Sequence, residues 1–301
     1  MSEPARRAVL ALVFNAFVWG TSWWPLRRLQ EAGLHPLWAT TIIFTLASLA
    51  IAIARPRACM QVATTPALWL LVAAAGLTNA AFNWAIVIGD VVRVVLLFYL
   101  MPLWTVLLAR AVLGERLTKA AALRIGLGAI GAAIVLWPPA TSGPAAIGFA
   151  ARLPLPRSLA DWLGVVGGFS FAFNNVMLRR EAGAPEAGRA LAMFAGGALV
   201  AGALAAILTA SGAVPTPPPL ALPWVALAGA LTLVFLAGNL SLQYGAARLP
   251  ANRTAVIMLT EVVFASLSAL ALGGGVLTPR LATGGAFIVA GALLAAREPG
   301  R

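Results

Sequence analysis

The sequence has few of the residues from which enzymes and metal proteins build their sites. Of its 301 residues 10% are charged, and it has one cysteine and one histidine. The single Cys59 excludes a disulfide within the chain, and one histidine with two aspartates is too little for a zinc or two-metal centre. Bond chemistry on a lipid-linked substrate needs grouped acids, histidines or an activated nucleophile. No such group is present, so we expect neither an enzyme nor a cofactor.

Lysine is almost missing as well. Twenty of the 21 basic residues are arginine, Lys119 is the exception, and the net charge is +12. These residues are scattered in ones and twos between apolar runs instead of forming a basic tail. Such scattering is typical of membrane topology, so we expect the lipid bilayer as a partner and no nucleic acid.

Apolar residues are what the sequence has in excess. They make up 61% of the chain, and the mean hydropathy is +0.92, against about 45–50% apolar residues in soluble domains. A helix of about 20 apolar residues crosses ~30 Å of hydrocarbon. The windows of about that length are residues 8–26, 36–54, 67–88, 93–113, 120–138, 160–178, 187–209, 222–244, 251–272 and 281–296. We therefore predict an all-α polytopic membrane protein with ten transmembrane helices.

The arginines predict the orientation of these spans. With the N-terminus in the cytoplasm, 15 Lys and Arg residues fall on the cytoplasmic side and 6 on the other. Positive residues favour the cytoplasmic side, so both termini are expected there. Arg6-Arg7 before the first span has no convincing cleavage site after it, so we expect an uncleaved first helix. The predicted location is the bacterial inner membrane, in multi-pass form.

The second half of the chain repeats the first. After a shift of 160 residues LTNAAFNWA (77–85) lies over AGNLSLQYG (237–245), and Arg93 lies over Arg253. We predict a first five-helix repeat in residues 1–138, a linker in 139–159 and a second repeat in 160–301. Because five is odd, the second repeat crosses the membrane in the opposite sense. Inverted repeats with a midplane site are common in secondary transporters, although a duplicated scaffold without transport is the alternative.

Two segments at corresponding places resemble a known family. YLMPLWTVLLARAVLGERLT (99–118) and LTEVVFASLSALALGGGVLT (259–278) resemble the repeat signature of the EamA family in the drug/metabolite transporter superfamily, and FVWGTSWWPLRR (17–28) resembles its first span. Within the family the chain looks most like aromatic amino-acid exporters of the YddG type. The resemblance implies export of amino acids or related metabolites and two inverted repeats around a central cavity.

Four carboxamides in spans three and eight are the first candidate site residues. Asn79 and Asn83 share one helix face, as do Asn239 and Gln243. An unpaired carboxamide in hydrocarbon costs several kcal/mol, so these side chains face protein, water or substrate. We predict that all four line one shared cavity. The alternative is hydrogen bonding between helices, worth about 0.6 kcal/mol on average.

Glu261 is the one carboxylate near the centre of a predicted span. A membrane carboxylate is a functional candidate by default. It can take up a proton or hold a substrate ammonium group, and a structural acid is the third possibility. Pro102 lies inside span four, removes a backbone hydrogen bond and marks a hinge or a static kink. Arg93 reaches either the membrane interface or a gate.

Aromatic residues inside the spans complete the candidate site. They can stack on a ring or hold an ammonium group by cation–π attraction, or simply pack between helices. The predicted cavity residues are Trp19, Asn79, Asn83, Trp84, Tyr99, Trp104, Phe171, Asn174, Asn239, Gln243, Tyr244 and Glu261, with Pro102 as hinge.

This mixture of amides, one acid and aromatic rings suits a neutral amino acid. We expect a secondary transporter that exports aromatic or neutral amino acids, or related small metabolites, by alternating access, with protons as a possible partner. The alternative is a sugar-phosphate or nucleotide-sugar exchanger. That function calls for Lys or Arg in the cleft, whereas every basic residue here maps to a span end or loop.

Overall fold

The computed structural model describes residues 3–114, 119–137, 153–180, 185–246, 248–249 and 251–297, and these residues contain helices but no strand. Most of the predicted linker 139–159 lies outside them. The helices are α1 (Glu3–Thr21), α2 (Trp23–Glu31), α3 (Pro36–Ala54), α4 (Arg57–Thr64), α5 (Pro66–Ile88), α6 (Val91–Phe98), α7 (Met101–Leu113), α8 (Lys119–Leu136), α10 (Leu159–Arg180), α11 (Glu186–Ala210), α12 (Leu222–Ala246), α13 (Ala251–Met258), α14 (Thr260–Leu272) and α15 (Pro279–Arg297).

Within the described residues, six helical segments are long and apolar enough to cross a membrane. They are Glu3–Glu31, Pro36–Ala54, Pro66–Ile88, Val91–Val112, Glu186–Ala210 and Leu222–Ala246. Shorter apolar helices cover Ala121–Leu136, Val256–Leu272 and Pro279–Leu294. The fold is that of a polytopic, all-helical membrane protein. The number of ten spans remains a prediction, although a helix or a pair of successive helices lies over each predicted window.

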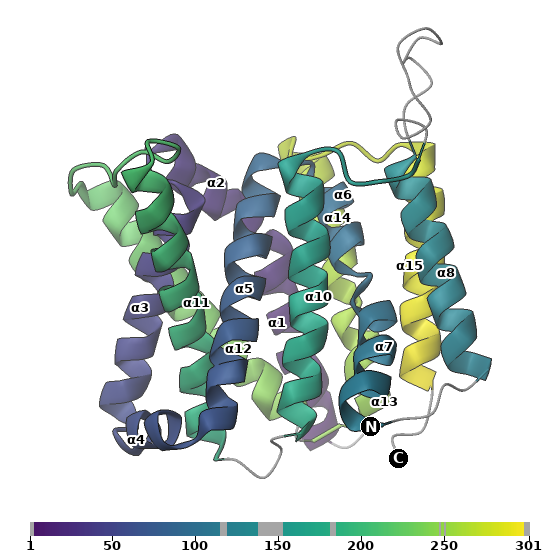
Figure 1. The fold of residues 1–301 in the computed structure, drawn as a ribbon, viewed down its shortest axis with the longest axis horizontal. Helices are drawn as coiled ribbons and strands as arrows, with labels where there is room; N and C mark the ends of the chain where they lie inside the picture. The colour runs from purple at the N-terminus through teal and green to yellow at the C-terminus, as the bar shows by residue number, and fades with distance from the viewer. Residues whose placement is uncertain are drawn as a thin grey trace, which may run out of the picture.

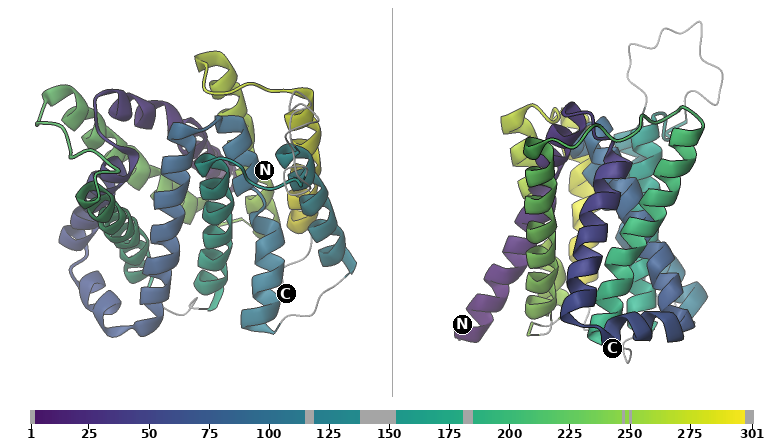
Figure 2. Two further views of the ribbon diagram at one scale, coloured as in Figure 1. Left: turned by 45° about the horizontal axis from the view of Figure 1, so that its top comes forward. Right: turned by 90° about the vertical axis from the view of Figure 1, so that its left-hand side faces the viewer.

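The long helices stand side by side and have two common ends (Figure 1). The chain starts at the lower end in Figure 1 and in the right-hand view of Figure 2, and the loop from α14 to α15 lies at the opposite, upper end. We call these ends the lower and upper ends throughout. Helix α10 runs from the upper end downward, whereas α1 runs upward from the lower end.

Two predicted spans are interrupted. Pro102 predicts a hinge or a static kink in the first of them, whereas no sequence pattern indicated the second interruption. The first divides into α6 and α7 at Tyr99–Leu100, and the second into α13 and α14 at Leu259. Pro102 lies in the first turn of α7. Without an N–H it cannot donate to the carbonyl four residues earlier, so it favours a break just before itself. The second interruption lies 160 residues after Tyr99, which is the shift of the sequence repeat.

Helix packing places the interrupted segments in the interior. Helix α1 packs against α12, α13 and α14, and α10 packs against α5, α6 and α7. Most of α6 is buried in the main hydrophobic core. Helices α3, α5 and α11 pack against each other, and α8 packs against α15. The interrupted helices therefore have neighbours from both halves of the chain.

Candidate functional site

Tyr99 and Glu261 meet where the two interrupted helices approach each other. Tyr99 is 2% exposed and follows the last residue of α6, while Glu261 is 8% exposed and lies in the first turn of α14. The Tyr99 hydroxyl donates to Glu261 Oε2 at 3.0 Å, and it lies 3.2 Å from the carbonyl oxygen of Met258, the last residue of α13. The other carboxylate oxygen of Glu261 bonds to no described residue. This second oxygen of the buried carboxylate can therefore bind a cation or a proton.

Helix α1 forms the wall beside this junction. The buried Asn15 donates to the sulfur of Met258 at 3.6 Å, and its own oxygen is buried without a hydrogen-bond partner. Further along α1, Gly20 packs so closely on α14 that a Cβ there would overlap the Glu261 carbonyl. Trp19 stacks on Phe235 of α12 with ring centroids 4.8 Å apart. Asn15 is thus a site residue that sequence reasoning missed, although it is an isolated amide in an apolar run.

Helices α7 and α10 carry further predicted residues on the other side. Trp104 contacts Phe169 edge to face at 5.6 Å, and Phe171 lies 5.4 Å from Phe98. Trp104 Nε1, Asn174 Oδ1 and Ser170 Oγ are buried without a hydrogen-bond partner. Buried polar atoms are nearly always paired, with protein or with water. Unpaired atoms on helices that adjoin the interruption indicate a place for water or a polar solute.

Each carboxamide pair has its own hydrogen-bond partners, and a cavity shared by all four remains a prediction. Asn79 donates to the Ala75 carbonyl of its own helix at 2.8 Å, and Asn83 donates to Thr40 Oγ1 on α3 at 3.2 Å. On α12, Gln243 donates to Asn239 at 2.7 Å. No hydrogen bond in the described part of the chain joins the α5 pair to the α12 pair. The bond from Asn83 to α3 is a hydrogen bond between helices, which is the alternative to lining a cavity.

Two aromatic residues lie away from the Tyr99–Glu261 junction. Trp84 packs edge to face on His35, with ring centroids 5.3 Å apart, and joins a small core cluster with α11 residues. Tyr244 is 36% exposed, and the Arg248 guanidinium lies 3.7 Å from its ring centroid. Their shared cavity with Tyr99 therefore remains a prediction.

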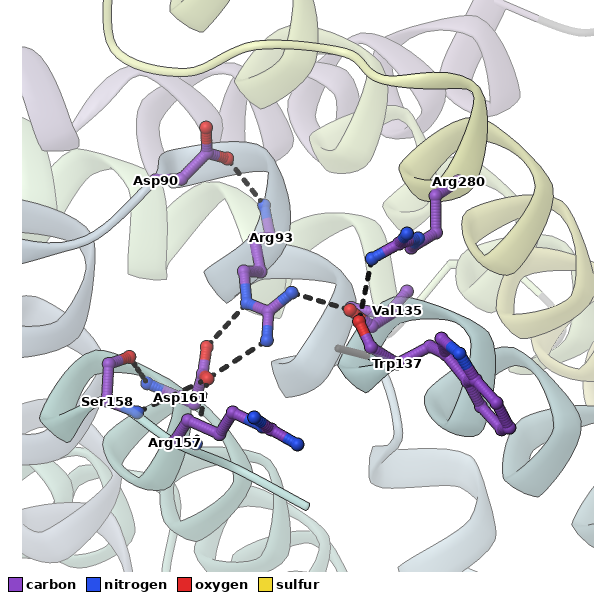
Figure 3. A network of polar contacts seen from close by, with 8 residues as sticks. All are labelled: Asp90, Arg93, Val135, Trp137, Arg157, Ser158, Asp161 and Arg280. Carbon is purple, nitrogen blue, oxygen red and sulfur yellow. Dashed lines mark hydrogen bonds and ion pairs between the residues drawn. The ribbon is translucent and has the colours of Figure 1, made fainter. Parts of the chain in front are cut away.

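A second polar site, drawn in Figure 3, lies where α6 and α10 begin, at the upper end of the bundle in Figure 1. Arg93 of α6 binds Asp161 of α10 through two hydrogen bonds, Nε–Oδ1 at 2.6 Å and Nη2–Oδ2 at 3.0 Å. Its third nitrogen, Nη1, donates to the Val135 carbonyl of α8 at 2.5 Å. Asp161 is 3% exposed. One guanidinium thus joins three helices.

Local sequence fixes the position of Asp161. Ser158 precedes α10, and its hydroxyl accepts from the Asp161 backbone N–H at 3.1 Å. In return Asp161 Oδ2 accepts from the Ser158 and Arg157 backbone N–H groups at 3.4 and 3.1 Å. This is a reciprocal cap of the helix N-terminus. The Ser158-x-x-Asp161 spacing was a signal from which the position could have been predicted.

Asp90 and Arg27 connect the same end to the second half of the chain. Asp90 accepts from the Arg93 backbone N–H at 2.9 Å and from that of Val276 at 2.8 Å. Arg27 donates to the Val87 carbonyl at 3.1 Å, the Gly89 carbonyl at 2.5 Å and, in the second half, the Gly274 carbonyl at 3.4 Å. The start of α6 is therefore held firmly by its surroundings.

A pocket of about 380 Å³ opens beside the Arg93–Asp161 pair. Its lining is Ile88, Gly89, Asp90, Arg93, Val94, Ser158, Leu159, Ala160 and Asp161. Its charged groups are already bonded to one another. No group of three potential metal ligands occurs within the described residues.

Comparison with known proteins agrees with this architecture. No curated protein matches the sequence. A solved crystal structure has the same fold, with a TM-score of 0.58 and 22% identity over 96% of this chain and 95% of the other. Residues 6–137 match the model of the EamA-like transporter family. Members of this family are membrane transporters and not enzymes. This match makes the first part of the chain similar to the EamA-like transporter family.

Proposed function

We propose that the chain is a secondary transporter that exports neutral or aromatic amino acids, or related small metabolites, by alternating access between two inverted repeats. The observation that carries this proposal is the meeting of two interrupted helices at Tyr99 and Glu261. Discontinuous helices near the midplane are where secondary transporters bind substrates and coupling ions, because the interruption leaves backbone polar groups free.

Matched packing of the two halves supports inverted repeats. The packing of α1 on α12 and α14 has a counterpart in the packing of α10 on α5 and α7. The two interruptions lie 160 residues apart in the sequence, which is also the shift of the sequence repeat. Similar halves with matched contacts can exchange conformations, which opens a central site first to one side and then to the other.

The chemistry of the junction favours a ligand with a positive group. Glu261 holds one oxygen on Tyr99 and leaves the other for an ammonium group or a proton. Among the unpaired polar atoms on adjoining helices, Trp104 Nε1 can donate to the carboxylate of such a solute, and the side-chain oxygens of Asn15 and Asn174 can accept from its ammonium group. The rings of Trp19 and Phe171 supply apolar contact. Amino acids combine these three features.

The test is flux into proteoliposomes with radiolabelled Phe, Trp, Met and Thr. We expect transport of at least one of them, and a loss of about tenfold or more in Glu261→Gln, since a tenfold loss corresponds to about 1.4 kcal/mol of binding. Gln keeps an acceptor for the Tyr99 hydroxyl, so the fold is retained. Glu31→Gln, in the exposed pair with Arg28, is the control and should transport normally.

Lack of flux for all four amino acids would contradict the proposed substrate class. Counterflow of a phosphate ester would instead favour the sugar-phosphate alternative. Imposing a pH gradient separates two roles of Glu261. A response that disappears in Glu261→Gln supports proton coupling, and an unchanged response assigns the carboxylate to the substrate.

A further inference from the structure

We infer that Arg93 and Asp161, together with the rings of Phe98 and Phe171, form the extracytoplasmic gate of the transporter, and that this gate is closed in the structure. The inference rests on the proposed function, because a gate has meaning only in an alternating-access cycle. The gate consists of two layers of residues between the pocket beside the Arg93–Asp161 pair and the Tyr99–Glu261 junction. The upper layer is ionic and the lower layer is aromatic.

The ionic layer connects the two halves of the chain. Arg93 and Val135 belong to the first half and Asp161 to the second, and all three are joined through one guanidinium. Asp161 is almost completely buried, so its charge depends on Arg93 for compensation. A buried charge that loses its partner is strongly unfavourable. Separation of α10 from α6 therefore requires water to enter from the pocket beside the pair.

The aromatic layer lies directly below. Phe98 follows Arg93 by five residues on α6, and its ring contacts Phe171 of α10 at 5.4 Å and Phe82 of α5 at 4.6 Å. Gly168 brings α10 so close that a Cβ there would overlap the Phe98 carbonyl. The next residue after Phe98 is Tyr99, ~9 Å along the helix from Arg93 at 1.5 Å per residue. Tight packing of these rings excludes a solute path from the pocket to Tyr99.

The two ends of the bundle differ in the acidic residues that can pair with the repeated arginine. The 160-residue shift places Arg253 over Arg93, but it places Pro250 over Asp90. The first 21 residues, which include α1, the counterpart of α10, contain one acid, Glu3, and it pairs with Arg7 of its own helix. The sequence thus repeats the arginine without the two aspartates. The ion pair belongs to the upper end, which the 15-to-6 distribution of basic residues assigns to the extracytoplasmic side.

The test measures access to a cysteine below both layers. Asn174→Cys in a Cys59→Ser background places a thiol ~20 Å below Asp161 along α10 and about one helical turn below Phe171. Right-side-out vesicles are treated with a membrane-impermeant maleimide. We expect slow labelling in this parent and several-fold faster labelling after Asp161→Asn, which keeps the cap acceptor but removes the charge. Arg93→Lys keeps the charge and loses the bidentate geometry, so its rate should be intermediate.

Arg28→Gln is the matched control, because it breaks an exposed pair within α2 on the same side. It should label at the parent rate. Size-exclusion chromatography and thermal unfolding establish that each variant is folded. Folded Asp161→Asn and Arg93→Lys proteins that label no faster than the parent would overturn the gate. Labelling does not depend on the substrate, so a failed flux assay would contradict the amino-acid proposal and leave this result standing.

Discussion

At the scale of single residues, the Tyr99 hydroxyl offers a backbone carbonyl the hydrogen bond that a backbone N–H supplies elsewhere in a helix. Where α13 ends, the Met258 carbonyl lacks a regular helical partner, and Tyr99 lies within hydrogen-bonding distance of both this oxygen and Glu261. In an apolar interior an unpaired carbonyl is costly. One side chain of the first half therefore stabilises an interruption in the second half.

Tyr99→Phe should lower the free energy of unfolding by about 1–3 kcal/mol, because it leaves buried acceptors without a donor. The chain offers a matched control in its second tyrosine. The Tyr244 ring is partly exposed, and its hydroxyl bonds to no described residue, so Tyr244→Phe should be close to neutral. Thermal unfolding of both variants in the same detergent is the measurement. Equal stability of the two would contradict the role of the Tyr99 hydroxyl.

His35 gives a pH dependence that can be predicted in sign. It lies in the turn before α3, where its Nδ1 accepts from the Leu37 N–H at 3.2 Å. Burial lowers the pKa of His35 below its ordinary value. The unfolded chain then binds a proton more readily than the folded chain, so stability falls as the pH drops through about 6.5.

His35→Asn should remove this part of the pH dependence, because asparagine also caps helices but does not titrate. Melting temperatures of both proteins measured from about pH 8 to about pH 5 test the prediction. The decrease towards acid should be smaller in the variant. An equally steep decrease in both proteins would assign the pH dependence to other groups.

At the scale of helices, glycine pairs set the closest crossings. Gly76 of α5 and Gly196 of α11 lie against each other, and a Cβ on Gly196 would overlap the Val72 carbonyl. Small residues allow such backbone contact between membrane helices. The same arrangement recurs at Gly131 of α8 and Gly284 of α15. These crossings make α5–α11 and α8–α15 compact pairs.

Gly196→Ala should destabilise the protein by about 1–3 kcal/mol, the usual cost of overpacking a filled interior. Gly229→Ala on α12 is the control, because a Cβ at that position would have no neighbour within 4 Å. Alanine is the better helix former by about 1 kcal/mol, so this variant should be neutral or more stable. Thermal unfolding compares them. A Gly196→Ala protein as stable as Gly229→Ala would refute the close crossing.

In the described residues, six of the ten predicted windows lie over helices long and apolar enough to cross a membrane, because span length is a matter of hydropathy, which the sequence displays directly. The interruption at Leu259 escaped prediction since it changes backbone hydrogen bonding and leaves hydropathy unaltered, whereas Pro102 indicated a hinge or kink close to Tyr99. Periodicity placed Asn79 and Asn83 on one face of α5, but the partner of Asn83 depends on which helix packs there. Asp161 was overlooked because an acid at a span end is typical of an interfacial residue.

At the scale of the whole molecule, labelling of the single native cysteine can show how the protein is oriented in the membrane. Cys59 is exposed on α4, at the lower end of the bundle (Figure 1). With the N-terminus in the cytoplasm, a membrane-impermeant thiol reagent should label Cys59 in inside-out vesicles and leave it unlabelled in intact cells. Cys59→Ser controls for background. Labelling in intact cells would reverse the orientation and move the proposed gate to the cytoplasmic side.

The Arg93–Asp161 pair also bears on the electrical behaviour of transport. The two side chains carry opposite charges at nearly the same height in the bundle, so together they contribute no net charge. Moving one elementary charge across the whole membrane is worth about 2.3 kcal/mol per 100 mV. If α10 separates from α6 within the plane of the bilayer, neither charge changes depth. Opening of this gate should then proceed equally well in energised and depolarised membranes.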